Sequence, residues 1–307
     1  MRWIEIALSV DGEAAEAVAD LLSRYGHQGI SIEQEGILPE AYSEADVPPP
    51  ERLTVRAYMA DDENVALAKK QLEDGLRYMN MMYPMPQPTY RTVDDEDWAN
   101  VWRDHYHPIR LGQRILIRPL WHDIPVGADD IELALDPGMA FGTGTHPTTQ
   151  LCLIALEQTV QPGQRVLDLG CGSGILAIAA AKLGAASVLA LDIDELAVTS
   201  TRENIAVNGV GSKIDVGQGG LETVITSARR FDLIVVNIIA PVIIGMCANG
   251  LGQTVRPGGY AIFSGVIESQ AEEVEAALQQ TGLIPHDRHQ QGDWLAIVCR
   301  RPASDPS

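Results

Sequence analysis

The sequence contains few cysteines and no pair of them at the spacing of a metal site. The four are far apart and form no Cys-x-x-Cys motif: Cys152, Cys171, Cys247 and Cys299. This argues against a zinc site and against a disulfide framework, and we expect no bound metal. Free thiols suit a reducing compartment, so a cytoplasmic location is expected.

The chain also lacks a long uninterrupted apolar run. The most apolar stretch, 233–248, contains Asn237 and Pro241, and it is shorter than the ~20 residues that span a bilayer. The first residues, MRWIEIALSVDGE, alternate apolar and polar side chains and soon become acidic, unlike a signal peptide. We therefore expect neither a membrane segment nor a secretory leader.

Positive charge is scarce: 22 Lys and Arg stand against 42 Asp and Glu, for a formal net charge of -20. A nucleic-acid binder needs a cationic surface to neutralise phosphates, so direct nucleic-acid binding is not expected. An acidic surface attracts cationic partners and speeds their encounter, which suits a basic protein substrate. The same acidity is explained equally well by solubility alone.

Length and element order indicate two domains. The chain has 307 residues, more than a typical single domain, and 46% of them are hydrophobic, enough for a sizeable core. The order strand-helix-strand, then strand-helix-strand, is typical of a small ferredoxin-like α+β domain. The strands are expected at 3–10, 29–33, 53–59 and 89–93, and the helices at 13–25 and 62–78. We assign residues 1–91 to this domain, 92–107 to a linker and 108–307 to a second domain.

In the second domain, strands and helices alternate after a first strand at 114–120. This alternation indicates an α/β fold with an open, mostly parallel sheet and helices on both faces. The last two strands flank HQQGDW and are predicted to form a hairpin that adds an antiparallel edge. The other strands are expected at 165–169, 187–191, 213–216, 231–238 and 260–264, and the helices at 175–183, 195–207, 242–251 and 268–280.

A glycine loop, in VLDLGCGSG, follows the strand at 165–169. Its glycines, Gly170, Gly172 and Gly174, allow a tight turn and a close approach of backbone to ligand. The spacing G-x-G-x-G is one residue shorter than the dinucleotide fingerprint G-x-G-x-x-G. Preceded by Asp168, it is similar to an S-adenosylmethionine loop, and Asp168 can accept a hydrogen bond from the ammonium of that ligand.

Two further polar residues end predicted strands. Asp192 closes the strand in VLALDID, where a carboxylate can accept from both ribose hydroxyls, although a NAD site uses an acidic residue at the same place. Asn237 ends the strand in DLIVVNIIAP. Methyltransferases that act on amino groups often have Asn or Asp, two prolines and an aromatic residue here, whereas this chain has Asn-Ile-Ile-Ala. The alternative for Asn237 is a residue that caps the following turn.

The segment 136–149, DPGMAFGTGTHPTT, gives the most specific resemblance. Together with GCGSGILAIAA, DIDELAV and VVNIIA, it resembles the ribosomal protein methyltransferase family called PrmA, whose target is protein eleven of the large subunit. The resemblance implies a ferredoxin-like substrate-recognition domain, a linker and a class I S-adenosylmethionine-dependent methyltransferase domain of Rossmann-like architecture. It also implies S-adenosylmethionine as cofactor, and three methyl groups added to lysine side chains and to an N-terminal α-amine.

The family's cofactor contacts carry over to four residues here: Thr149, Gly170, Asp192 and Asn237. The resemblance places Phe141 beside the cofactor as well. We add Gly172 from the same loop, and we take Asn237 as the candidate catalytic residue.

A physical interpretation of GTGTHPTT points the same way. Pro147 is predicted to begin a helix, so Thr148 and Thr149 fall in its first turn, beside unsatisfied backbone amides that can bind a carboxylate. The alternative is a capped helix start with no special role. For His146 alone, a structural role is the simpler expectation.

Other functions stay open at this point. The same glycine loop would serve a methyltransferase acting on another protein or on a small amine. A non-catalytic adaptor is possible, and a NAD-dependent oxidoreductase is disfavoured by the missing G-x-x-G spacing. We expect a monomer.

Overall fold

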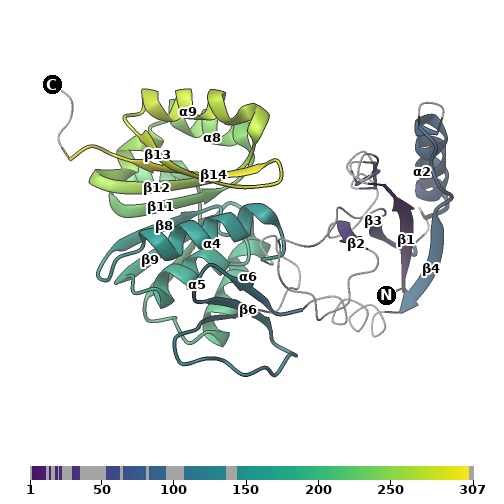
Figure 1. The fold of residues 1–307 in the computed structure, drawn as a ribbon, viewed down its shortest axis with the longest axis horizontal. Coiled ribbons are helices and arrows are strands. Elements are labelled where there is room, and N and C mark those ends of the chain that lie inside the picture. The colour runs from purple at the N-terminus through teal and green to yellow at the C-terminus, as the bar shows by residue number, and fades with distance from the viewer. Residues whose placement is uncertain are drawn as a thin grey trace. The chain divides into compact units, whose positions relative to one another are not determined.

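The computed structural model describes residues 2–11, 14, 18–19, 21–22, 30–34, 53–62, 65–80, 83–94, 107–135 and 144–303. The chain divides into two compact units, 1–106 and 107–307 (Figure 1). The linker expected at 92–107 lies mostly outside the described residues, so it stays a prediction.

The first unit is built on an antiparallel sheet of four strands in the order β2-β3-β1-β4. The strands are β1 (Arg2–Val10), β2 (Ile30–Gln34), β3 (Leu53–Ala60) and β4 (Thr89–Asp94), and α2 spans Val65–Met79. Alternate residues of β1 point to one face and pack with α2 in a single core. This small antiparallel sheet confirms the expected α+β domain.

The first predicted helix is described only in part. Residues 14, 18–19 and 21–22 are helical, and Ala14, Val18 and Leu22 are buried in the same core as β1. Their spacing of four residues places them on one face of the helix. The rest of 13–25 lies outside the described residues.

The second unit contains a sheet of seven strands in the order β10-β9-β8-β11-β12-β14-β13. The strands from β10 to β12 are parallel, and β14 and β13 form an antiparallel hairpin at one edge, as predicted. The strands are β8 (Arg165–Leu169), β9 (Ser187–Asp192), β10 (Ile214–Gln218), β11 (Phe231–Asn237), β12 (Val255–Ile267), β13 (Ile284–Gln291) and β14 (Trp294–Arg300).

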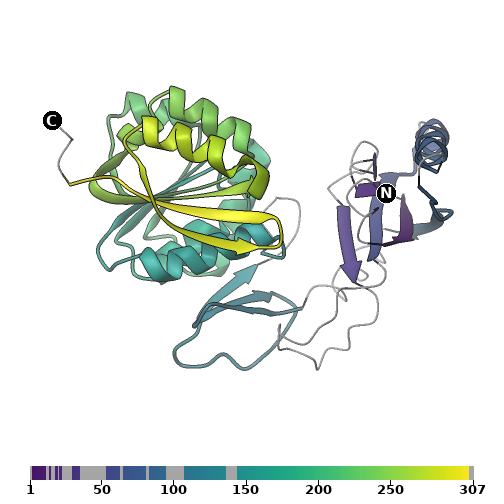
Figure 2. The ribbon, with the colours of Figure 1, turned by 45° about the horizontal axis from the view of Figure 1, so that its top comes forward.

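Helices cover both faces of this sheet. In Figures 1 and 2, α4, α5 and α6 lie on one face and α8 and α9 on the other. The helices are α4 (Pro147–Thr159), α5 (Ile175–Lys182), α6 (Glu195–Val207), α7 (Leu221–Thr226), α8 (Ala240–Ala248) and α9 (Ala271–Gln280). Short 3-10 turns at Leu251–Thr254 and Glu268–Gln270 precede β12 and α9.

The central strands alternate between two separate cores. In β11, Leu233 and Val235 belong to the core beneath α4 and α5, whereas Ile234 and Val236 belong to the core beneath α8 and α9. Burial on both faces explains the continuous apolar runs of these strands. By the same alternation, Asn237 at the end of β11 is on the α4 side.

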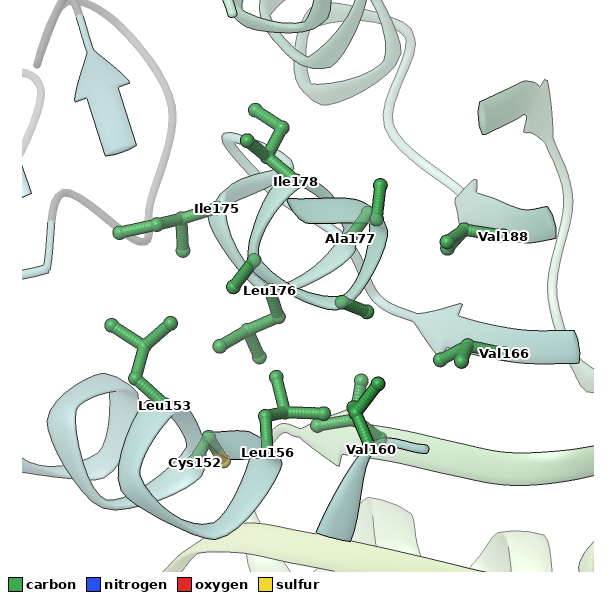
Figure 3. Packing of buried hydrophobic residues seen from close by; sticks show 14 of the residues in the cluster. Cys152, Leu153, Leu156, Val160, Val166, Ile175, Leu176, Ala177, Ile178 and Val188 are labelled. Atoms are coloured by element: carbon green, nitrogen blue, oxygen red, sulfur yellow. The ribbon is translucent and has the colours of Figure 1, made fainter. Parts of the chain in front are cut away.

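The core beneath α4 and α5 is made of buried apolar side chains. Figure 3 shows Leu153 and Leu156 of α4 pointing toward Leu176 of α5, and Val166 of β8 belongs to the same cluster, on the far side of Val160. All five side chains are buried, and Leu153, Leu156 and Val166 have no exposed surface. This packing joins α4 to the strand that leads into the glycine loop.

A separate sheet of three strands was predicted only in part. Its strands are β5 (Ile109–Leu111), β6 (Ile115–Pro119) and β7 (Ile131–Leu135), of which only the strand at 114–120 was expected. Asn208 of the α6 C-terminus holds β7, because its side chain donates to Ala134 O at 2.6 Å and accepts from Ala134 N at 3.0 Å. Side-chain contacts between distant segments of this kind leave no local sequence signal.

Two helix starts differ from the prediction. Helix α8 begins at Ala240 rather than at 242, because Pro241 fits the first turn of a helix, where its missing N–H costs nothing. Helix α9 begins at Ala271, after the 3-10 turn that takes up the first residues of the predicted 268–280 helix. Among the residues described, none of the helices has the length and apolar character needed to cross a bilayer.

Replacing Leu156 by Ala should destabilise the second unit by about 2–5 kcal/mol, because the residue is fully buried between α4 and α5 and would leave a cavity. Urea unfolding followed by circular dichroism measures the change. The matched control is Leu196→Ala, at a side chain that is 61% exposed, which should shift stability by less than about 0.5 kcal/mol. Equal effects of the two substitutions would contradict the packing described.

Candidate functional site

The glycine loop after β8 requires glycine at more than one position. Gly170, Gly172 and Gly174 have φ values of 80°, 54° and 81°, in the left-handed region that glycine adopts most readily. A Cβ on Gly170 would lie 3.0 Å from Ile238 Cγ2, and one on Gly174 would lie 2.8 Å from Thr201 Cγ2. Packing against Ile238, just after β11, and against Thr201 in the middle of α6 therefore accounts for part of the glycine motif, independently of any ligand.

Asp192 ties the end of β9 to this loop. Its Oδ2 accepts from Gly172 N at 2.9 Å, and its Oδ1 accepts from Asp194 N at 3.0 Å. A carboxylate oxygen can accept more than one hydrogen bond, so the half-buried side chain can still receive the two hydroxyls of a ribose. The structure thus brings two predicted site residues, Gly172 and Asp192, into direct contact.

Asp168 is fully buried at the end of β8. Its Oδ2 accepts from Ala177 N in α5 at 2.9 Å, while its Oδ1 has no hydrogen-bond partner among the described residues. Burial raises the pKa of Asp168 to about 7; the Ala177 N–H opposes this rise, and the nearby charge of Asp192 adds to it. A buried carboxylate with one oxygen unpaired is complementary to a cationic donor. The ammonium of S-adenosylmethionine fits this requirement.

Thr149 and Asn237 meet between α4 and β11. Asn237 Nδ2 donates to Thr149 Oγ1 at 3.3 Å, and Thr149 is buried while Asn237 is half-buried. In this orientation the amide oxygen of Asn237 is the group that can accept from an amine. Two more predicted site residues, from segments far apart in the sequence, are thereby neighbours.

His146 caps the first turn of α4. Its Nδ1 accepts from Thr148 N at 3.3 Å, and its backbone oxygen accepts from Thr149 N at 3.0 Å and Gln150 N at 3.2 Å. The prediction of unsatisfied amides in this turn is therefore wrong, because His146 already satisfies them. The structural role expected for His146 agrees with this geometry, and burial lowers the pKa of its ring.

The candidate site is the edge of the sheet where parallel strands end. Asp192 and Asn237 are the last residues of β9 and β11, and Asp168 is the next-to-last residue of β8, which lies between them. Ligands of open α/β sheets bind at these strand ends. The remaining predicted residue, Phe141, lies outside the described residues. Within the described ranges, His, Cys, Asp and Glu side chains form no group of three or more placed to hold a metal.

Sequence reasoning missed the residues that support this edge. Ile238 packs under Gly170, and Thr201 of α6 donates to Gly172 O at 2.8 Å. Trp294, at the start of β14, packs its ring against His146 with centroids 4.9 Å apart. Nothing in the sequence near these residues signals the contacts, since each joins segments distant along the chain.

Comparison with known proteins identifies the relatives. The family model described as ribosomal protein L11 methyltransferase (PrmA) matches residues 2–302. A ribosomal protein L11 methyltransferase of Chloroflexus aurantiacus is 42% identical over 98% of both chains. One from Listeria monocytogenes is 40% identical over 98% of this chain and 99% of its own.

A solved structure is also similar. The crystal structure of a ribosomal protein L11 methylase from Lactobacillus delbrueckii subsp. bulgaricus is 38% identical, with a TM-score of 0.59, and the match covers 64% of this chain and 100% of that one. The likeness confirms the predicted class I S-adenosylmethionine-dependent methyltransferase fold.

Asp168 should make cofactor binding depend on pH. Binding an ammonium requires the ionised carboxylate, so below the raised pKa of about 7 the ligand must displace a proton. Affinity for S-adenosylhomocysteine should be greatest near pH 7.5, and the Kd should rise toward tenfold per unit as the pH falls well below 7. Calorimetry between pH 5.5 and 7.5 measures this.

The variant Asp168→Asn is the control. It should bind roughly 10- to 100-fold more weakly at pH 7.5, because a charged hydrogen bond is lost, and its remaining affinity should vary little over this range. An unchanged pH dependence in the variant would remove Asp168 from the cofactor site.

Proposed function

We propose, since this chain belongs to the PrmA family of ribosomal protein L11 methyltransferases, that it methylates amines of large-subunit ribosomal protein L11. The family match spans nearly the whole chain, both units included. The observation that carries the proposal is the meeting of Asp168, Asp192 and Asn237 at one edge of the sheet. These groups supply acceptors for an ammonium, for hydroxyls and for a substrate amine.

S-adenosylmethionine is the cofactor of this family, in agreement with the prediction. When bound, it supplies an electrophilic methyl group on a sulfonium sulfur. Asp168 would hold its ammonium and Asp192 its ribose hydroxyls, with Gly170 and Gly172 letting the backbone come close. Phe141, predicted from the family resemblance, completes the proposed contacts.

Asn237 is the proposed catalytic residue. Its Nδ2 is fixed by Thr149, so its amide oxygen can accept an N–H of an incoming primary or monomethylated amine and aim the lone pair at the methyl group; a dimethylated amine has no N–H left and would not be oriented in this way. The amide does not titrate, so Asn237 orients the nucleophile rather than removing its proton. Its contribution to the reaction rate in this proposal comes from orienting the amine toward the methyl group.

The substrate amines in this proposal are lysine side chains and an N-terminal α-amine, each trimethylated. An acidic protein with a net charge of -20 attracts a basic ribosomal protein and speeds its encounter. Residues 1–91 would form the substrate-recognition domain, and 92–107 a hinge that presents different amines to a single site. We also predict that the protein is a monomer, that it is located in the cytoplasm, and that it does not bind nucleic acid directly.

Intact-mass spectrometry tests the proposal directly. Incubating the protein with S-adenosylmethionine and purified ribosomal protein L11 should raise the mass of the ribosomal protein in steps of one methyl group. Peptide mapping then gives the modified amines and the number of methyl groups on each. Absence of transfer by a preparation that binds S-adenosylhomocysteine would favour a different protein substrate or an adaptor role.

The rate of lysine methylation should rise from pH 7 to pH 9 at saturating substrate. Only the neutral amine is nucleophilic, and a lysine of pKa near ~10.4 is about 0.1% neutral at pH 7.5. A partly dry site lowers that pKa and flattens the rise. Methylation of the α-amine, of pKa ~7.7–8.0, should level off earlier. A flat lysine profile would show that deprotonation is not limiting.

A further inference from the structure

We propose that the tip of the β13–β14 hairpin is a positioning element for the cofactor site, with Trp294 and Gln291 setting the first turn of α4. This proposal rests on the proposed function, because it concerns the placement of Thr149 and Asn237. Neither Trp294 nor Gln291 touches the proposed cofactor-binding residues directly in the contacts described. Their effect on the site would pass through His146 and Gln150.

The strand directions bring the hairpin tip to the correct edge. β12 runs parallel to β11, with Ser264 paired to Asn237. β14 is antiparallel to β12 and begins with Trp294, which pairs with Ile267. Ile267 lies farther along β12 than Ser264, on the side where β11 ends. The turn between β13 and β14 therefore lies at the edge of the sheet where the candidate site is. In Figures 1 and 2 this turn lies beside α4.

Trp294 fixes the N-cap of α4. Its ring meets the His146 ring edge to face, with centroids 4.9 Å apart and planes at 69°. His146 in turn holds the amides of Thr148 and Thr149 through its Nδ1 and its backbone oxygen. A shift of His146 would thus move Thr149, which is the residue that orients Asn237.

Gln291 provides a second attachment through Gln150. Gln150 Nε2 donates to Gly144 O at 3.3 Å and to Thr145 O at 3.1 Å, so it closes the turn before α4. Its Oε1 accepts from Gln291 Nε2 at 3.2 Å. One amide thereby joins the loop, the helix and the hairpin.

The tip is itself anchored on its other side. Asp293 O accepts from Glu268 N at 2.8 Å, and Gln290 Nε2 donates to Glu268 Oε2 at 3.2 Å. Gln291 and Trp294 are half-buried and lie outside the two apolar cores. Because the tip adds little to either core, its contacts with α4 serve mainly to define position.

The test compares Trp294→Ala, Trp294→Phe and Gln291→Ala in the full chain. Trp294→Ala should weaken S-adenosylhomocysteine binding about tenfold in calorimetry, since a displacement of about 1 Å near a site costs up to ~10²-fold. Trp294→Phe keeps an aromatic ring against His146 and should restore most of the affinity. Gln291→Ala should cost roughly 2- to 10-fold, as expected for one hydrogen bond.

Two further readouts separate positioning from general stability. The ring protons of His146 should lose the shift caused by the Trp294 ring in Trp294→Ala, and regain part of it in Trp294→Phe. In methylation assays, the KM for S-adenosylmethionine should rise, while the KM for the protein substrate stays within about twofold of the wild-type value. Trp121→Ala removes a tryptophan elsewhere in the same unit and should leave cofactor affinity unchanged.

The outcomes are distinguishable. If Trp294→Ala loses the His146 ring shift but binds S-adenosylhomocysteine like the wild type, the hairpin does not position the site. If Trp294→Ala does not fold, Gln291→Ala decides, and wild-type affinity in that variant overturns the proposal. The wild type could also bind S-adenosylhomocysteine but methylate no ribosomal protein L11. That result would overturn the proposed substrate, while the affinities of the variants would still decide the role of the hairpin.

Discussion

The buried carboxylate of Asp168 is the physical constraint at the centre of the candidate site. It lies one residue before the end of β8, accepts a hydrogen bond from the backbone of Ala177 in α5, and keeps one oxygen unpaired among the described residues. A charge in this position is costly without a cationic partner, which is why its pKa rises to about 7.

The strands that carry the site could be predicted from the sequence because both faces of the sheet are buried. Such strands are continuous apolar runs, so a polar residue at their ends, such as Asp192 or Asn237, stands out. The glycine spacing could be recognised because positive φ values at Gly170, Gly172 and Gly174 leave few alternatives to glycine. These signals are local, and they are enough to predict a candidate site at this edge of the sheet.

Other features could not be predicted because they depend on contacts between distant segments. The sequence suggested free amides at the start of α4, yet His146 occupies them through its ring and backbone. Only one strand of the three-stranded sheet was predicted. Asn208 and Ala134, whose hydrogen bonds attach this sheet to α6, are far apart along the chain. The same holds for Trp294, whose neighbour His146 belongs to another part of the fold. Periodicity reports burial but not which element provides it.

The antiparallel direction of β14 has a practical consequence. The strand begins with Trp294 at the end of the sheet where the candidate site lies. It finishes with Arg300, which pairs with Tyr260 toward the other end of the strands. Arg301 continues there, bonding to Gly252 and Gly259. A fluorophore or surface anchor attached at Ala303 would therefore be held on the side of this unit away from the glycine loop. Single-molecule or immobilised measurements could use that position while leaving the approach to the ligand edge open.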